Sequence, residues 1–309
     1  ISSITFLFIA ILLMRFSGQG MMSHTATTTI SRYFTKSRGK ALSTGWFGLS
    51  TAEFILPVLM IYLLSIINWK IIWIYISILV LIFLPIISFY LIKNLNFDSR
   101  EETSEKNENF KNIKNWTRLE VVKDYRFYII CMNMLAMPWI ATGVFVYQSF
   151  ILSSKGWGPY IIAQSFMVYS ITSVITLFVA GFLIDKFTSR KLLIYMNLPL
   201  LLSAGVLFYF KNPVSSFFFL GLIGISNGLA NVLGSSTWAE IYGVRHIGSI
   251  KALTTALMVF ATAFGTALFG FLIDKGLSIE NISIISGTYI FSSIILLILI
   301  KEKLNPIYQ

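Results

Sequence analysis

Long apolar stretches separated by polar connections dominate the chain. There are nine of them, at residues 3–32, 41–66, 71–93, 127–151, 160–184, 191–210, 214–239, 252–273 and 280–300. A helix needs about 20 mostly apolar residues to cross the hydrocarbon core of a bilayer. Lipid offers no hydrogen-bond partners to an open backbone, so a crossing segment satisfies its own backbone groups as a helix. The pattern therefore predicts an all-α polytopic membrane protein, a bundle with nine transmembrane helices.

One connection is much longer than the others. Residues 94–126 are rich in Asn, Glu and Lys, and their acidic and basic side chains nearly balance. This composition is typical of a solvated linker rather than a folded domain. It divides the chain into a partial N-terminal bundle of three helices at 1–93 and a six-helix C-terminal bundle at 127–309.

Composition agrees with a membrane protein and excludes several kinds of site. The 309 residues are 56% hydrophobic and only 12% charged, whereas soluble domains carry about 25% charged residues. A single cysteine and two histidines predict no internal disulfide, no metal site and no cofactor. The net charge of +11 does not indicate nucleic acid, because the basic residues are spread between the hydrophobic stretches.

The distribution of Lys and Arg predicts the orientation. If successive connections lie on alternate sides, 19 of the 24 basic residues share the side of the long loop and the C-terminus, four lie on the other side, and Arg15 lies within a stretch. Basic residues concentrate on the cytoplasmic side, so we expect the loop and the C-terminus in the cytoplasm of a cell-membrane protein. With an odd number of spans the chain then begins outside, and three further spans before Ile1 would give two halves of six.

Two short sequences occur twice. GFLIDK stands at 181–186 and at 270–275, at the ends of the fifth and eighth stretches and therefore on opposite sides of the membrane. GKALST at 39–44 is similar to IKALTT at 250–255. Three-span units repeated in inverted orientation are common in secondary transporters.

The first GFLIDK copy extends into GFLIDKFTSRK at 181–191, which resembles the loop signature of the major facilitator superfamily, Gly-x-x-x-Asp-Arg/Lys-x-Gly followed by basic positions. The matching residues are Gly181, Asp185, Lys186, Arg190 and Lys191. Thr188 stands where the family usually has glycine, so we expect a less tight turn there. RFSGQG at 15–20 resembles the family's fourth-helix arginine-glycine motif, although its first glycine comes one residue early.

This resemblance implies helices four to twelve of a twelve-helix monomeric transporter that works by alternating access. It also implies that the 181–191 cluster is a latch, in which Asp185 accepts hydrogen bonds from the N-terminus of the next helix and Gly181 permits close helix packing. The alternative is a topology signal alone. RYFTKSRGKALS at 32–43 is similar to the family's fourth-to-fifth loop, most of all in the branch that transports small organic anions such as monocarboxylates, oxalate and formate.

Two charged residues lie within the predicted spans. Arg15 and Glu53 stand about 25 and 20 Å from the cytoplasmic ends of their helices, at about 1.5 Å per residue. A charge at mid-bilayer costs about 2.5–3.5 kcal/mol on insertion scales, so each is a candidate functional residue. Arg15, with Gln19 on a similar face, is predicted to bind an anionic substrate or to couple to protons, and the family resemblance allows Glu53 to carry a proton. Alternatively the two form a structural ion pair.

Uncharged polar residues complete the predicted substrate path. Asn227 and Asn231 share one face of the stretch 214–239, and Asn133 and Gln148 lie on 127–151. The alternative for each is an interhelical hydrogen bond in a packed bundle.

We therefore predict a secondary active transporter of a small solute, most simply a small organic anion such as a carboxylate. A proton or an exchanged anion is the expected coupling partner, and the lipid bilayer the surroundings. Transport of a neutral solute or drug and a non-transporting membrane subunit are the alternatives. We expect no enzyme and no catalytic residues, because the sequence shows no HExxH, no cluster of His or Asp in a span and no nucleotide-binding loop.

Overall fold

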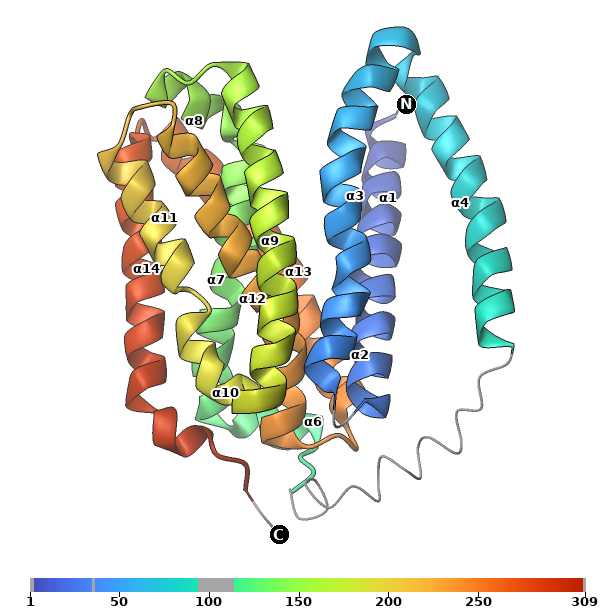
Figure 1. Cartoon of the computed structure of the whole chain (residues 1–309), viewed down its shortest axis with the longest axis vertical. Coiled ribbons are helices and arrows are strands. Elements are labelled where there is room, and N and C mark those ends of the chain that lie inside the picture. The colour runs from blue at the N-terminus through green and yellow to red at the C-terminus, as the bar shows by residue number, and fades with distance from the viewer. Residues whose placement is uncertain (1–2, 35–36, 94–113, 308–309) are drawn as a thin grey trace.

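The computed structural model describes residues 3–34, 37–93 and 114–307, and every regular element in these ranges is helical. The prediction of an all-α bundle is confirmed. Figure 1 shows two groups of helices, an N-terminal half and a C-terminal half, which lie close together at the end where α2 and α10 are found and apart at the other end. Residues 94–113 of the predicted central loop lie outside the described residues.

The N-terminal half contains three predicted spans. The first span is one continuous helix whose middle part has π-helical geometry. The elements are α1 (Ile4–Met14), η1 (Arg15–Met22), α2 (Ser23–Tyr33), α3 (Arg38–Ile66) and α4 (Trp69–Ile92). Large apolar side chains along α1 and α4 are exposed, which a lipid environment tolerates because lipid tails are as apolar as the side chains.

The C-terminal half contains the other six. Its elements are α6 (Arg118–Lys123), α7 (Tyr125–Val146), α8 (Gln148–Lys155), α9 (Pro159–Phe187), α10 (Ser189–Leu192), η2 (Leu193–Tyr195), α11 (Leu198–Tyr209), α12 (Ser215–Tyr242), α13 (Ile247–Asp274), α14 (Ile279–Leu299) and η3 (Lys301–Leu304). Eight helical stretches of the described residues are long and apolar enough to cross a membrane. The remaining predicted span, 41–66, forms the 29-residue helix α3.

Two spans differ in detail from the prediction. The stretch 127–151 divides at Tyr147 into α7 and α8, and 191–210 divides into α10, η2 and α11. The second break lies where Pro199 occupies the first turn of α11. Proline lacks a backbone donor and disfavours helical geometry in the residue before it, so a continuous helix cannot pass through this point easily.

The predicted loop also ends earlier than residue 126. Thr117 and Glu120 form a reciprocal capping box at the start of α6, and Asp124 caps α7 by accepting a hydrogen bond from the N–H of Arg126. Such caps satisfy helix N–H groups that lack a partner within the helix. Arg126 therefore belongs to α7 rather than to the loop.

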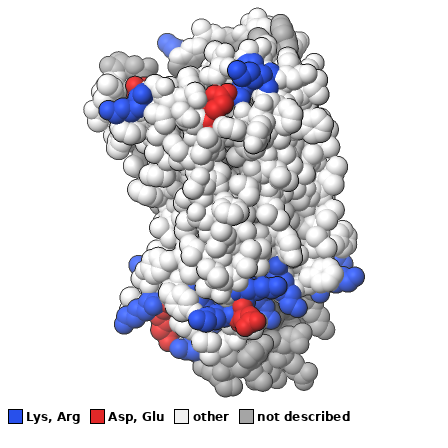
Figure 2. All heavy atoms as spheres, turned by 90° about the vertical axis from the view of Figure 1, so that its left-hand side faces the viewer, with Lys and Arg blue, Asp and Glu red and all other residues white. Residues whose placement is uncertain are grey.

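Charged side chains gather at the two ends of the molecule. Figure 2 shows Lys, Arg, Asp and Glu at both ends of this face and none across its middle, with the larger group of basic residues at the lower end. We call this the basic end; it holds the start of α3, the α9–α10 turn, the start of α13 and η3. At the opposite end, Lys155 of α8 pairs with Glu280 of α14 at 2.8 Å.

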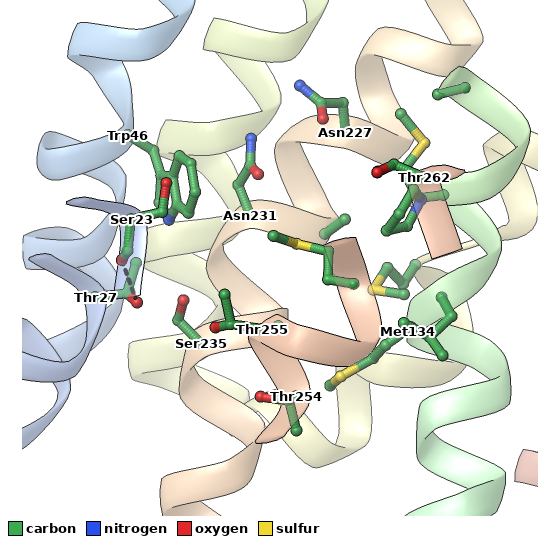
Figure 3. Close-up of a pocket in the computed structure, with 18 of the residues that line it drawn as sticks. Ser23, Thr27, Trp46, Met134, Asn227, Asn231, Ser235, Thr254, Thr255 and Thr262 are labelled. Carbon is green, nitrogen blue, oxygen red and sulfur yellow. Dashed lines mark hydrogen bonds between the residues drawn. The ribbon is translucent and has the colours of Figure 1, made fainter. Parts of the chain in front are cut away.

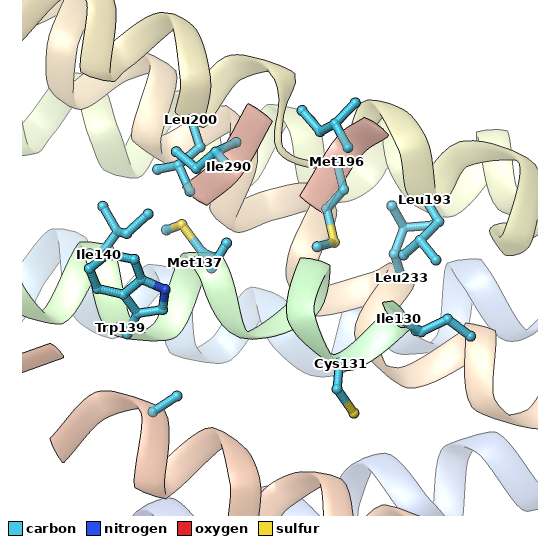
Figure 4. Close-up of a cluster of buried hydrophobic side chains, with 14 of the residues drawn as sticks. Ile130, Cys131, Met137, Trp139, Ile140, Leu193, Met196, Leu200, Leu233 and Ile290 are labelled. Carbon is cyan, nitrogen blue, oxygen red and sulfur yellow. The ribbon is translucent and has the colours of Figure 1, made fainter. Parts of the chain in front are cut away.

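The main hydrophobic core lies within the C-terminal half. Side chains of α7 pack there against η2, α11, α12 and α14, as Figure 4 shows for Met137 and Ile140 against Leu200 and Ile290. Helix α13 packs against α7 as well, and the part of α7 that neither contact covers borders the space between the halves.

Candidate functional site

A cavity of about 340 Å³ lies between the two halves, within the size range of small-molecule sites. Figure 3 shows Ser23, Thr27 and Trp46 of the N-terminal half on one side, opposite Asn231 and Ser235 of α12. The polar lining residues are Ser23, Thr27, Glu53, Thr142, Asn227, Asn231, Ser235, Lys251, Thr254, Thr255 and Thr262. Apolar and aromatic side chains fill most of the rest, among them Trp46, Met134, Met137, Phe145, Tyr169, Trp238 and Met258.

Three of the predicted path residues line this cavity: Glu53, Asn227 and Asn231. Asn227 also donates a hydrogen bond to Ser173 Oγ of α9 at 3.0 Å. Glu53 comes from the N-terminal half, and its Oε2 is buried without a hydrogen-bond partner in the described part of the chain. The structure thus brings a carboxyl group and two amides from opposite halves to one space.

The other predicted path residues lie elsewhere. Arg15 has an exposed side chain at the junction of α1 and η1 and is not among the lining residues. The side chain of Gln19 lies outside the described residues. Gln148 begins α8, beyond the cavity. Whether Arg15 contacts a substrate stays a prediction.

Asn133 is a packing residue in this arrangement. It is fully buried, its Nδ2 donates to Ser293 Oγ of α14 at 3.4 Å, and its backbone carbonyl accepts from Asn197 Nδ2 at 2.6 Å. Asn133 does not line the cavity. These contacts match the interhelical alternative considered for it.

Lys251 is a lining residue that the sequence reading assigned to a cytoplasmic connection. The predicted span began at residue 252, whereas α13 begins at Ile247, so Lys251 lies one turn inside the helix. Its side chain is only 3% exposed, and its Nζ donates a hydrogen bond to Ser31 Oγ of α2 at 3.0 Å. The apolar residues Ile247 and Ile250, spaced three apart, were the signal that could have revealed the earlier helix start.

Asp185 of the loop motif caps a helix, but not the predicted one. Its Oδ1 accepts from the N–H of Gly39 at 3.0 Å and its Oδ2 from the N–H of Lys40 at 3.4 Å. Both donors begin α3, in the N-terminal half. The next helix, α10, is capped instead by Glu240 of α12, which accepts from the N–H groups of Ser189 at 2.8 Å and Arg190 at 3.3 Å.

Two glycines allow this contact between the halves. A Cβ atom on Gly39 would overlap the carbonyl oxygen of Gly181, and one on Gly181 would lie 2.6 Å from Ser43 Oγ. The start of α3 and the end of α9 therefore touch backbone to backbone. We call this contact, formed by Gly39, Gly181 and Asp185, the α3–α9 latch.

The turn after the motif is as tight as a glycine turn, so the expectation of a looser one was wrong. Thr188 has φ 73° and ψ 145°, a region that side chains with a Cβ rarely adopt. Its hydroxyl is buried without a partner in the described residues. The caps at Asp185 and Glu240 hold the helices on both sides of the turn, which leaves Thr188 little freedom to relax.

The remaining basic residues of the motif surround this turn. Lys186 and Lys191 are exposed and Arg190 is half-buried. The second GFLIDK copy ends α13 at the opposite end of the molecule, where Gly270 lies against the hydroxyl of Tyr147. The two copies therefore occupy opposite ends, as the alternation of spans predicts.

Comparison with known proteins provides a family match. The sequence profile of the Major Facilitator Superfamily matches residues 1–266. No curated protein matches the chain.

Proposed function

We propose, because the chain belongs to the Major Facilitator Superfamily, that it carries a small organic anion across the cell membrane by alternating access. The family consists of multi-pass membrane transporters of small molecules and not of enzymes. The observation that carries the proposal is the cavity lined by both halves beside a contact that closes one end. Rocking the halves about such a site opens it to one side and then to the other.

We place the basic end in the cytoplasm. The positive-inside rule supports this orientation, because most basic residues of the connections lie at that end. The cavity is then closed toward the cytoplasm in the present conformation by the α3–α9 latch, and opening this latch is a step of the transport cycle.

An anionic substrate is supported by the buried cation in the cavity. Lys251 supplies an ammonium group from α13, and charge-assisted hydrogen bonds to a carboxylate are the strong ones. Asn227 and Asn231 add amide donors on α12. The support for a carboxylate therefore comes mainly from Lys251, and Arg15 is a second candidate.

A neutral or hydrophobic solute is the second candidate substrate. Trp46, Trp238 and several methionines give the cavity an apolar, adaptable wall. Such a solute would not require Lys251. A non-transporting membrane subunit is a third possibility, in which the cavity binds no solute.

Glu53 is our candidate for the coupling residue. It is the acidic residue among the lining residues, and its buried oxygen without a partner is costly when ionised. A proton taken up on one side and released on the other would couple transport to the proton gradient. Exchange against a second anion is the alternative coupling.

Uptake into proteoliposomes tests these proposals. The full-length protein would be supplied with radiolabelled acetate, lactate, oxalate and succinate, and wild type compared with Lys251→Met and Arg15→Ala. Saturable uptake of a carboxylate that Lys251→Met abolishes supports the anion proposal. Uptake of a neutral solute that neither variant affects supports the second candidate, and no uptake together with stable binding to a partner protein supports the subunit.

A further inference from the structure

We propose that Lys251 is a substrate-operated tether between the two halves. Its ammonium group holds α2 to α13 at the basic end through Ser31, and an anionic group in the cavity takes the ammonium from Ser31 and so favours opening of that end. This inference rests on the proposed function, and it adds the link between substrate binding and the conformational change.

The contact joins the two halves directly. Ser31 belongs to α2 and is fully buried, and its hydroxyl accepts the hydrogen bond from Lys251 Nζ of α13 at 3.0 Å. The same hydroxyl lies 3.5 Å from the carbonyl oxygen of Ser235 on α12. Because α12 and α13 belong to the other half, these bonds break when the halves separate at the basic end.

The contact also borders the cavity, and in this it differs from the α3–α9 latch. Lys251 and Ser235 are lining residues, whereas Asp185 and Gly39 are not. A solute in the cavity therefore lies next to Lys251 without any prior movement of the halves. The basic end has two closures, and the one at Lys251 is accessible to the transported molecule.

The chemistry of the pair favours exchange of partners. A serine hydroxyl is a neutral acceptor, and a carboxylate is a stronger partner for an ammonium group in a site of low dielectric. Helices α3 and α13 both begin at the basic end. At about 1.5 Å per residue, Glu53 lies about 22 Å from the start of α3 at Arg38, and Lys251 lies about 6 Å from the start of α13 at Ile247. Glu53 therefore lies deeper in the molecule than Lys251, and an anionic solute in the cavity competes with Ser31 for the ammonium group.

The direction of the effect follows from linkage. A ligand shifts a conformational equilibrium only by its difference in affinity for the two states. Ser31 competes for Lys251 only while the basic end is closed, so an anion binds more tightly to the state in which Ser31 has withdrawn. Bound anion therefore shifts the protein toward opening at the basic end, whereas a neutral solute lacks this effect.

Cys131 provides the measurement. It is the only cysteine of the chain and lines the cavity with 6% exposure, so a thiol reagent reaches it slowly in the closed state. The full-length protein, with any cysteine outside residues 1–309 replaced by serine, would be placed in vesicles and treated at its basic end with a membrane-impermeant maleimide. The labelling rate of Cys131 is read with and without acetate, lactate, oxalate or succinate.

Ser31→Ala is expected to raise the labelling rate about tenfold or more without any solute, since it removes a hydrogen bond to a charged group that only the closed state makes. The matched control is Ser50→Ala: Ser50 is also buried in the N-terminal half, and its hydroxyl has no partner in the described residues. Equal labelling of Ser31→Ala and Ser50→Ala would overturn the tether.

The second arm tests the substrate. A carboxylate that accelerates labelling of wild type is expected to leave Lys251→Met unchanged, while Lys251→Arg keeps part of the response. Thermal unfolding of each variant checks that it is folded. Acceleration that persists in Lys251→Met would overturn the role of Lys251.

The two proposals fail in different ways. One outcome is that Cys131 is labelled faster in Ser31→Ala but no carboxylate changes its labelling in wild type. The contact between Ser31 and Lys251 then holds the halves together, but the proposal that an anionic substrate releases it is overturned. Carboxylate uptake, measured separately, then decides the proposed function. If carboxylates are taken up but do not speed the labelling of Cys131, the protein transports anions and residues other than Lys251 control the opening of the basic end.

Discussion

The carboxylate of Asp185 at the end of α9 accepts a 3.0 Å hydrogen bond from the backbone N–H of Gly39 at the start of α3. The two residues are 146 positions apart and belong to opposite halves of the transporter. The positive end of the α3 dipole adds to the attraction. A motif that is a local loop signature in the sequence therefore forms a bond between the two halves.

Replacing Asp185 by Asn is expected to weaken the closed state at the basic end. The variant loses the charge at a helix N-terminus and one acceptor, and the loss of a cap costs about 0.5–2 kcal/mol. The labelling rate of Cys131 from the basic end should rise accordingly. Asp274→Asn, at the same position of the second GFLIDK copy, is the matched control because Asp274 is exposed at the other end of the molecule. A similar effect of both variants would contradict the latch.

Gly39→Ala is expected to disrupt the same contact by shape alone. The added Cβ would overlap the carbonyl of Gly181, a backbone atom that cannot move aside easily. Transport should fall strongly while the protein still folds, because only the closed conformation is affected. Gly48→Ala on the same helix has nothing within 4 Å of its Cβ, and alanine favours a helix over glycine by about 1 kcal/mol. Normal transport by both variants would argue against backbone contact at the latch.

Thr188→Gly is expected to stabilise the protein. Thr188 has a positive φ of 73°, and strained backbone of this kind costs about 1–3 kcal/mol. Thr188→Ala removes the buried hydroxyl but keeps the Cβ, so the difference in melting temperature between the Gly and Ala variants isolates the backbone strain. A Gly variant no more stable than the Ala variant would show that the turn is not strained.

Asp124→Asn is expected to destabilise the C-terminal half severely. Asp124 Oδ2 pairs with Arg126 Nε at 2.8 Å and accepts from the hydroxyl of Tyr242 at 3.0 Å, and both charged residues are buried. Removing one partner of a buried pair costs about 3–5 kcal/mol, because it leaves the other charge uncompensated.

The double variant Asp124→Asn with Arg126→Met is the control for this pair. It should recover part of the stability, since no buried charge remains without its counter-ion. Unfolding in detergent measures both variants. A double variant less stable than the single one would show that Arg126 contributes chiefly through its bonds to the carbonyls of Lys303 and Asn305.

Glu53→Gln is expected to fold normally and to abolish any dependence of uptake on a proton gradient. The substitution keeps the shape of a cavity-lining side chain and removes its ability to exchange a proton. Uptake driven by an imposed pH gradient, compared with uptake driven by an internal store of the same carboxylate, separates the two couplings. A Gln variant that still responds to the pH gradient would exclude Glu53 as the proton carrier.

The sequence by itself determined the spans and the family. The spans are runs of apolar residues long enough to cross a bilayer, and the family signature is the loop motif at 181–191. Both are local features of the sequence and do not depend on which residues pack together. Asn227 and Asn231 could be placed on a shared face for the same reason, because helical periodicity depends only on spacing.

Only the tertiary structure decided which residues meet. From the sequence, Arg15 was the expected cation of the cavity. In the structure α2 packs against α13, the side chain of Arg15 is exposed, and Lys251 is buried beside the cavity. Asp185 likewise caps a helix of the other half rather than the next one. A hydrophobic pattern predicts that a helix is present and which of its faces is apolar. The neighbours of each side chain depend instead on how helices that are distant in the sequence pack together. That packing is determined by residues spread over the whole chain.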